Sequence, residues 1–322
     1  MGNKGDDVSQ AAGPAEGAKR KAVLIAGPTA SGKSALAIAL AQRFGGVVIN
    51  ADSMQVYRDL AIITARPDAA NLAAAPHRLY GTVDGAVNFS VARWLDAALA
   101  EIDAAGAEGL LPIVIGGTGL YFKALTQGLS DIPAVPDEVR RRLRAEAEGL
   151  SAPALHDRLH ALDPETAARL RPNDPQRVLR ALEVFVATGR PLAHWQAQRV
   201  GGIGDRIRLA AAILLPDRSA LFDRIDARCE AMFANGAIEE VATLLARKDL
   251  PADAPIRRAI GVPPIGEYLR DAIARDAALA QVQLDTRRYA KRQYTWFRHQ
   301  PPEEWHIATE SNEIDVAIAS LL

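Results

Sequence analysis

Apolar residues gather in four short, nearly unbroken runs, at residues 22–26, 47–50, 111–115 and 209–215. Runs of this length bounded by turn residues predict strands buried on both faces, as in a parallel sheet. Between the second and third runs, an apolar stripe of helical period predicts an amphipathic helix over residues 91–105. Strands that alternate with helices predict right-handed βαβ crossovers, and ligands of such sheets bind at the carboxyl ends of the strands.

The pattern changes after residue 128, where prolines punctuate short helical pieces and arginine becomes frequent. We interpret residues 129–202 as a mostly helical domain inserted into an α/β core of residues 21–128 and 203–322. Residues 1–20 carry almost no apolar bulk, which predicts a disordered tail. Helices are expected after the last predicted strand at 218–234, 236–247, 262–274 and 278–298.

The segment after the first apolar run has the sequence of a phosphate-binding loop. It reads G-x-x-x-x-G-K-S over Gly27, Pro28, Thr29, Ala30, Ser31, Gly32, Lys33 and Ser34. The glycines let successive N–H groups converge on one anion, and the helix that follows presents its positive end to it. Lys33 supplies a mobile cation and Ser34 a hydroxyl for Mg²⁺, so a phosphate site is predicted here.

Composition limits the possible functions without choosing one. The 322 residues suggest two structural units, and a net charge of −1 requires any polyanion contact to come from local clusters. With Cys229 as the one cysteine, we expect no internal disulfide, no cysteine zinc site and a reducing cytoplasm. No apolar run approaches the roughly 18 residues of a membrane span, and the N-terminus has no hydrophobic signal core, so no membrane contact is expected.

Two residues at predicted strand ends are candidates for chemistry. Asp52 is a Mg²⁺ ligand, a general base near cationic groups, or a cap of the next helix. Thr118 lies among Gly116, Gly117 and Gly119, which permit a backbone to approach a ligand closely. Its hydroxyl either bonds a phosphate oxygen or belongs to a plain turn.

Arginines form a further set of candidates. A helical wheel over 218–234 places Arg228 at the edge of the buried face and Arg224 nearer to solvent. Arg228 can aim its guanidinium at an anion or pair at the surface with Asp223 or Glu239, and the pattern alone favours the surface pair. Basic clusters in the insertion and the last helix could grip a phosphate backbone, although core packing explains the aromatic residues of that helix equally well.

The residues alone predict a P-loop enzyme with a helical insertion, for which a small-molecule or nucleotide kinase is the default function. A non-catalytic RNA-binding P-loop protein is a second alternative. The glycine-rich strand end after residue 115 and the size of the insertion fit a kinase poorly.

Taken together, several segments resemble the tRNA dimethylallyltransferases, also called tRNA isopentenyltransferases. They follow the family's order at residues 27–34, 52–57, 75–79, 116–121, 173–184, 258–261 and 289–298. The resemblance implies a P-loop NTPase-like parallel sheet flanked by helices. It implies transfer of a dimethylallyl group from dimethylallyl diphosphate to N6 of the adenosine 3′ of the anticodon, with release of diphosphate. Mg²⁺ is the implied cofactor and the tRNA anticodon stem-loop the partner, and we expect a cytoplasmic monomer.

The resemblance also implies roles for individual residues. Lys33, Thr118 and Arg228 would stabilise the departing diphosphate held by the P-loop, and Ser34 would hold the metal. Asp52 would take the proton from N6 of an adenine that has left its stack. Contacts to the tRNA would come from Asp52, Ser53, Met54, Gln55, Thr118, Arg140, Gln176, Arg177, Val178, Leu179, Arg180, Arg257, Arg258 and Gly261.

Two segments depart from the family's pattern. Ile63 and Arg66 stand where the family usually has glycine and lysine, so the substrate contacts of this loop are not carried over. Val262 begins a segment that replaces a more usual tyrosine-bearing one, and the tRNA contact there is not carried over either.

Overall fold

The computed structural model describes residues 20–196 and 199–321. The chain divides into two compact units, residues 1–122 with 205–322 (unit 1) and residues 123–204 (unit 2). These boundaries lie within six residues of the expected insertion at 129–202. Most of the tail predicted at 1–20 falls outside the described residues, and Arg20 already belongs to a strand.

Unit 1 is built on a six-stranded parallel sheet of order β3-β2-β4-β1-β7-β8. Its strands are β1 (Arg20–Ala26), β2 (Gly46–Asn50), β3 (His77–Arg78), β4 (Leu111–Gly116), β7 (Ile207–Leu214) and β8 (His306–Ala308). The four apolar runs are the four central strands, as predicted. Ala26 lies opposite Gly116 on one side and Ile213 on the other, so the carboxyl ends of β1, β4 and β7 meet at one edge.

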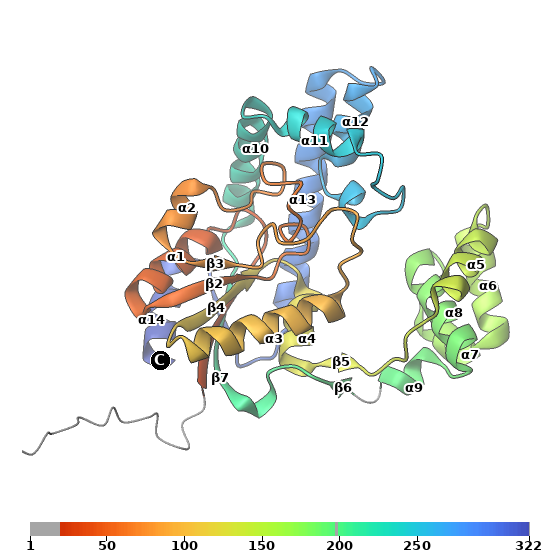
Figure 1. Ribbon diagram of the computed structural model, residues 1–322, viewed down its shortest axis with the longest axis horizontal. Coiled ribbons are helices and arrows are strands. Elements are labelled where there is room, and N and C mark those ends of the chain that lie inside the picture. The colour runs from red at the N-terminus through yellow and green to blue at the C-terminus, as the bar shows by residue number, and fades with distance from the viewer. Residues whose placement is uncertain (1–19, 197–198, 322) are drawn as a thin grey trace, which may run out of the picture. The chain divides into compact units, whose positions relative to one another are not determined.

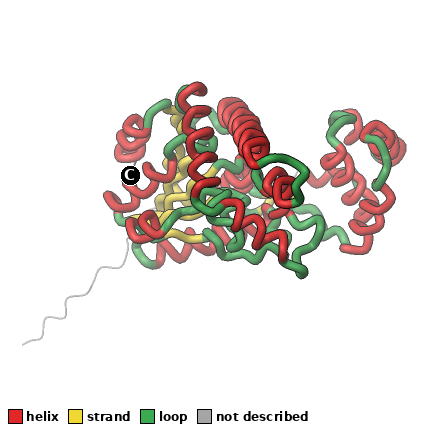
Figure 2. Tube along the Cα trace, turned by 90° about the horizontal axis from the view of Figure 1, so that it is seen from above, coloured by secondary structure: helices red, strands yellow, loops and turns green. Residues whose placement is uncertain are grey.

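Helices cover both faces of this sheet (Figure 2). The helices of unit 1 are α1 (Lys33–Phe44), α2 (Ala69–Ala74), α3 (Val91–Ala107), α4 (Gly119–Gln127, which runs on into unit 2), α10 (Arg218–Ala234), α11 (Ala237–Ala246), α12 (Val262–Leu269), α13 (Arg275–His299) and α14 (Ser311–Leu321), with 3₁₀ turns at Gly204–Arg206 and Pro255–Arg258. Leu36 and Leu40 of α1 pack with Ile314 of α14 against one face of the sheet. Figure 1 shows α10, α11, α12 and α13 grouped together within unit 1.

The helix predicted at 262–274 is wrong at its end, because α12 stops at Leu269. Asp271 adopts a left-handed φ of 56°, and its N–H donates to the Tyr268 carbonyl at 2.9 Å. The N–H of Ala272 reaches back to Glu267 at 3.0 Å. These bonds satisfy the last carbonyls of the helix and turn the chain into α13.

Unit 2 consists of short helices and one small ladder. The helices are α5 (Asp137–Ala147), α6 (Ala152–Leu162), α7 (Pro164–Arg169), α8 (Pro175–Thr188) and α9 (Leu192–Gln196), and β5 (Leu129–Ser130) pairs antiparallel with β6 (Arg199–Val200). That two-residue pairing was not predicted. Pro164 and Pro175 start helices whose first turns are capped by the carboxylates of Asp163 and Asp174. These two prolines therefore mark helix starts, where a missing N–H costs nothing.

Unit 2 has its own apolar core, which includes the fully buried Leu159, Val178 and Leu182. In the described part of the chain, no helix has both the length and the apolar character needed to cross a membrane.

Candidate functional site

The P-loop connects the end of β1 to the start of α1 at the edge where the central strands end. Gly32, the residue before α1, has a φ of 96°, and no side chain caps the first turn. The free N–H donors of that turn and its positive dipole are therefore available to an anion. A Cβ on Gly27 would lie 2.6 Å from the carbonyl oxygen of Leu214, so the loop passes β7 too closely for any other residue.

A polar cavity of about 330 Å³ lies over this loop. Its walls are Thr29, Ala30, Ser31, Gly32, Lys33 and Ser34 of the loop, with Asp52, Gln55, Thr64, Ala65, Tyr80, Ile115, Gly116, Arg224 and Arg228. The cations Lys33, Arg224 and Arg228 outnumber the one carboxylate, Asp52. The cavity therefore favours a multiply charged anion.

Lys33 is held inside this cavity, where its ammonium donates to the carbonyl of Pro28 at 3.0 Å. Burial lowers the pKa of Lys33 from 10.5 to about 8, because desolvation disfavours the charged form. Asp52 opposes this change and Arg228 adds to it. An anion placed in the cavity would favour the protonated lysine.

Arg228 points into the cavity and donates to the hydroxyl of Thr29. Its Nε and the hydroxyl of Ser31 are buried and have no hydrogen-bond partner among the described residues. Buried polar atoms are nearly always paired, so both atoms are suited to bonding a ligand bound in the cavity that these residues line. The surface pair with Asp223 or Glu239 that the wheel favoured is wrong, because a wheel does not show that the P-loop packs against this edge of α10.

A second cavity, of about 270 Å³, adjoins the first and is mostly apolar. Its walls are Thr29, Asp52, Ser53, Met54, Ile63, Thr64, Arg228, Cys229, Met232, Arg258, Ala259, Ile260, Val282, Thr286, Tyr289 and Arg292. Four of these residues also line the polar cavity: Thr29, Asp52, Thr64 and Arg228. The site thus has an anion-binding compartment and an apolar compartment. The carboxylate of Asp52 and the guanidinium of Arg228 lie where the two compartments meet.

Asp52 follows β2 through Ala51. Its Oδ1 accepts the N–H groups of Met54 at 2.9 Å and Gln55 at 3.4 Å, and its own N–H donates to Asn50 Oδ1 at 2.8 Å. The carboxylate therefore caps a turn, and the expectation that it caps the next helix is wrong. The same carboxylate lines both cavities, so a chemical role is compatible with this structural one.

Thr118 lies beside the site without lining either cavity. Its hydroxyl accepts the N–H of Ser53 at 3.1 Å and hydrogen-bonds the hydroxyl of Tyr289. Burial raises the pKa of Tyr289, which keeps that phenol neutral. The structure therefore gives Thr118 a place in holding the turn after Asp52.

The glycines around Thr118 let other protein segments approach closely, whereas the sequence suggested a ligand, and Gly116 also lines the polar cavity. A Cβ on Gly116 would lie 2.1 Å from the carbonyl oxygen of Ala51. A Cβ on Gly117 would lie 2.1 Å from Gln293 Nε2, and one on Gly119 would lie 2.4 Å from the Trp296 ring. Both of these partners belong to α13.

Gln293 was not predicted as a site residue. Its buried amide accepts the N–H of Thr29 at 2.9 Å and donates to the carbonyl of Gly117 at 2.8 Å. One side chain of α13 thus ties the P-loop to the loop after β4. Its partners are 264 and 176 residues away in sequence, so no local spacing could reveal them.

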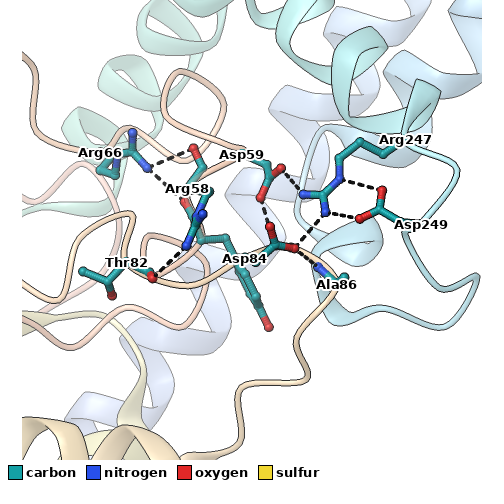
Figure 3. A network of polar contacts seen from close by, with 10 residues as sticks. Arg58, Asp59, Arg66, Thr82, Asp84, Ala86, Arg247 and Asp249 are labelled. Atoms are coloured by element: carbon teal, nitrogen blue, oxygen red, sulfur yellow. Dashed lines mark hydrogen bonds and ion pairs between the residues drawn. The ribbon is translucent and has the colours of Figure 1, made fainter.

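Helix α11, predicted at 236–247, holds the cavity wall at residues 60–65 through Glu240, whose role was not predicted. The carboxylate of Glu240 accepts the N–H groups of Ala61, Ile62 and Ile63 at 2.6 to 3.1 Å. After the helix, Arg247 forms ion pairs with three carboxylates, those of Asp59, Asp84 and Asp249 (Figure 3).

Each of the three residues that depart from the family's pattern contacts neighbouring protein atoms. Ile63 lines the apolar cavity and packs over Gly261, where a Cβ would lie 2.6 Å from its side chain. Arg66 lines neither cavity and donates to the backbone carbonyl of Tyr57 at 3.0 Å. Val262 is buried at the start of α12.

The predicted tRNA contacts divide by exposure. Gln176, Arg177 and Arg180 are exposed on α8, and Arg140 on α5 is partly exposed. Val178 is wrong as a contact, because it is fully buried in the core of unit 2, and the half-buried Leu179 packs against the same core.

The remaining predicted contacts lie near the apolar cavity of unit 1. Arg258 is exposed and lines it, whereas Arg257 donates to the carbonyls of Leu250 and Pro251. Gly261 is wrong as a surface contact because it is buried beneath Ile63.

Comparisons with known proteins agree with this picture. The model of a family described as IPP transferase matches residues 55–300. A tRNA dimethylallyltransferase of Methylocella silvestris is 58% identical over 285 residues, which are 88% of this chain and 94% of that protein. One of Azorhizobium caulinodans is 54% identical over 306 residues, 95% of this chain and 97% of the relative.

Two solved structures extend the likeness to three dimensions. The full-length tRNA isopentenylpyrophosphate transferase of Bacillus halodurans has a TM-score of 0.66 at 35% identity, covering 94% of this chain and 97% of its own. A eukaryotic dimethylallyltransferase described as acting on tRNA has a TM-score of 0.73 at 29% identity, covering 86% of this chain and 70% of its own.

Proposed function

This chain belongs to the IPP transferase family, and we propose that it transfers a dimethylallyl group from dimethylallyl diphosphate to N6 of the adenosine 3′ of the anticodon. The observation that carries the proposal is the meeting of an anion cradle and an apolar cavity at Asp52. A diphosphate would occupy the first compartment and a five-carbon allyl chain the second. The relatives support this reading and not the kinase alternative.

In the proposed reaction, the N6 lone pair forms a bond to the allylic carbon as the carbon–oxygen bond to the diphosphate breaks. The electron pair of the broken bond leaves with the diphosphate. Lys33, Arg228 and the free N–H groups of the first turn of α1 would stabilise this growing charge. Asp52, at the junction of the two cavities, would accept the N6 proton.

We propose Mg²⁺ as the cofactor. Among the described residues, no group of three or more His, Cys, Asp and Glu could hold a metal, so the ion would bind together with the diphosphate. The site fits such an ion, because Ser34, whose hydroxyl would hold it, lines the polar cavity proposed for the diphosphate. When bound, the ion supplies positive charge to the leaving group.

The tRNA would present its adenine as a base turned out of the anticodon stack, at a cost of a few kcal/mol. Ser53 and Met54 line the apolar cavity and Gln55 the polar one, which places this turn beside the proposed acceptor. The exposed arginines of unit 2 would contact the backbone of the stem-loop.

The decisive experiment incubates the protein with labelled dimethylallyl diphosphate, Mg²⁺ and unmodified tRNA. We expect label to enter the RNA at one adenosine and diphosphate to be released in equal amount. ATP consumption without labelled RNA would support the kinase alternative. Tight tRNA binding without any transfer would support a non-catalytic RNA-binding protein.

Asp52→Asn tests the proposed base within the same assay. We expect kcat to fall by about 10²- to 10⁴-fold, because an amide cannot accept the N6 proton. The tRNA dissociation constant should change little, since the turn after Asp52 can still be capped by the amide oxygen. An equal loss of affinity and turnover would contradict the assigned role.

A further inference from the structure

Unit 2 contains a buried carboxylate that joins two of its helices. Glu183 on α8 exposes only 6% of its side chain. Its Oε1 lies 3.5 Å from Nε of Arg144 on α5, and its Oε2 lies 3.5 Å from Nη1 of Arg180 on α8. One carboxylate thus bridges two guanidinium groups that come from different helices.

The two arginines are not buried with their partner. Their side chains are 45% and 44% exposed, and each guanidinium has five N–H donors in a rigid plane. Because nearly half of each side chain is exposed, both guanidinium groups are accessible to a ligand in solvent. Without Glu183, two like charges would repel and the long side chains would be free to separate.

The surroundings of Glu183 show why it must hold both arginines. A carboxylate this deeply buried is costly unless it is paired, so the folded unit favours rotamers that keep both guanidinium groups in place. By contrast, Arg169 and Glu165 of α7 form an ion pair between two exposed side chains, 2.6 Å apart. Such a surface pair orders its partners weakly.

We propose that Glu183 is a positioning residue for tRNA, because it fixes Arg144 and Arg180 as one binding site for the phosphate backbone. The proposal rests on the proposed function, which supplies the RNA, and it adds Arg144 and Glu183 to the residues that recognise it. Arg177, which is 76% exposed one turn before Arg180 on α8, extends the same basic surface. Forked N–H donors held in a fixed plane suit phosphate oxygens.

Glu183→Gln gives a test in which simple electrostatics and positioning predict opposite signs. Removing a negative charge beside a polyanion should tighten tRNA binding, whereas releasing two positioned arginines should weaken it. We expect a dissociation constant for unmodified tRNA about tenfold higher than that of the wild type. The slope of log affinity against log salt should also become shallower by about one, the loss of roughly one phosphate contact.

Glu165→Gln is the matched control, since it removes a paired but exposed carboxylate from the same unit. Its tRNA affinity should equal that of the wild type or exceed it slightly. In turnover assays, Glu183→Gln should raise KM for tRNA and leave kcat and KM for dimethylallyl diphosphate unchanged. Glu183→Gln binding as tightly as Glu165→Gln, with an unchanged salt slope, would overturn the proposal.

Arg180→Lys serves as the second variant in case Glu183→Gln fails to fold. It keeps the charge beside Glu183 but loses the planar fork, so we expect tRNA binding about threefold weaker or more. Unchanged binding in this variant would overturn the proposal as well. Failure of the proposed function is seen separately, as absence of label transfer by the wild-type protein.

Discussion

Lys33 is the residue whose charge state makes the site sensitive to pH. Its pKa in the free protein is about 8, so the lysine is charged below pH 8 and neutral above it. A neutral lysine cannot attract the diphosphate, and kcat/KM for dimethylallyl diphosphate should therefore fall by up to tenfold per pH unit above about pH 8. The decrease of kcat/KM above pH 8, the alkaline limb of the pH profile, measures this loss of charge directly.

Lys33→Arg is the control for that assignment, since a guanidinium stays charged throughout the range. Its activity should be lower, because the cradle is shaped for an ammonium, but its alkaline limb should disappear. A limb that remains at the same pH would assign the titration to another group. Binding of inorganic diphosphate above pH 8 should also take up a proton in the wild type, which calorimetry in two buffers detects.

At the scale of elements, Gln293 of α13 links the P-loop to the loop after β4. Gln293→Leu would leave the Thr29 N–H and the Gly117 carbonyl unpaired, at a cost of about 1–3 kcal/mol for each buried group. We expect a lower melting temperature and a higher KM for dimethylallyl diphosphate. Gln281→Leu on the same helix is the control, because among the described residues its amide bonds only Asp285, one turn away. Equal effects of the two variants would contradict a special role for Gln293.

The elements also show what sequence can and cannot predict. The P-loop and the four central strands were predictable because loop geometry and burial leave local patterns. The edge strands β3 and β8, of two and three residues, are too short to carry a pattern. Glu240 and the contact of Arg228 with the P-loop depend on packing between distant segments, which periodicity does not encode.

The motif at residues 173–184 shows, within one segment, what the sequence alone does not predict. The resemblance marks it as a unit for tRNA contact, yet a helix sends its side chains in all directions. The structure shows that Arg177 and Arg180 are exposed and that Val178 is buried. It also shows that the buried Glu183 forms an ion pair with Arg180.

At the scale of the whole molecule, the two units have separate apolar cores. Leu159 is fully buried in that of unit 2 and Leu40 in that of unit 1. Leucine to alanine at such positions costs about 2–5 kcal/mol of folding free energy. Each substitution should destabilise only the unit whose core it changes. Leu159→Ala should therefore weaken tRNA binding while diphosphate still binds to unit 1.

Calorimetric unfolding with and without inorganic diphosphate separates these effects. Diphosphate binds unit 1, so it should raise the melting temperature of Leu159→Ala as much as that of the wild type. Leu40→Ala should lose that stabilisation, because α1 carries the first turn of the anion site. Loss of diphosphate binding in Leu159→Ala, to the extent seen in Leu40→Ala, would show that the units fold as one. In that case the tRNA-binding defect of unit 2 variants could no longer be separated from damage to the phosphate site.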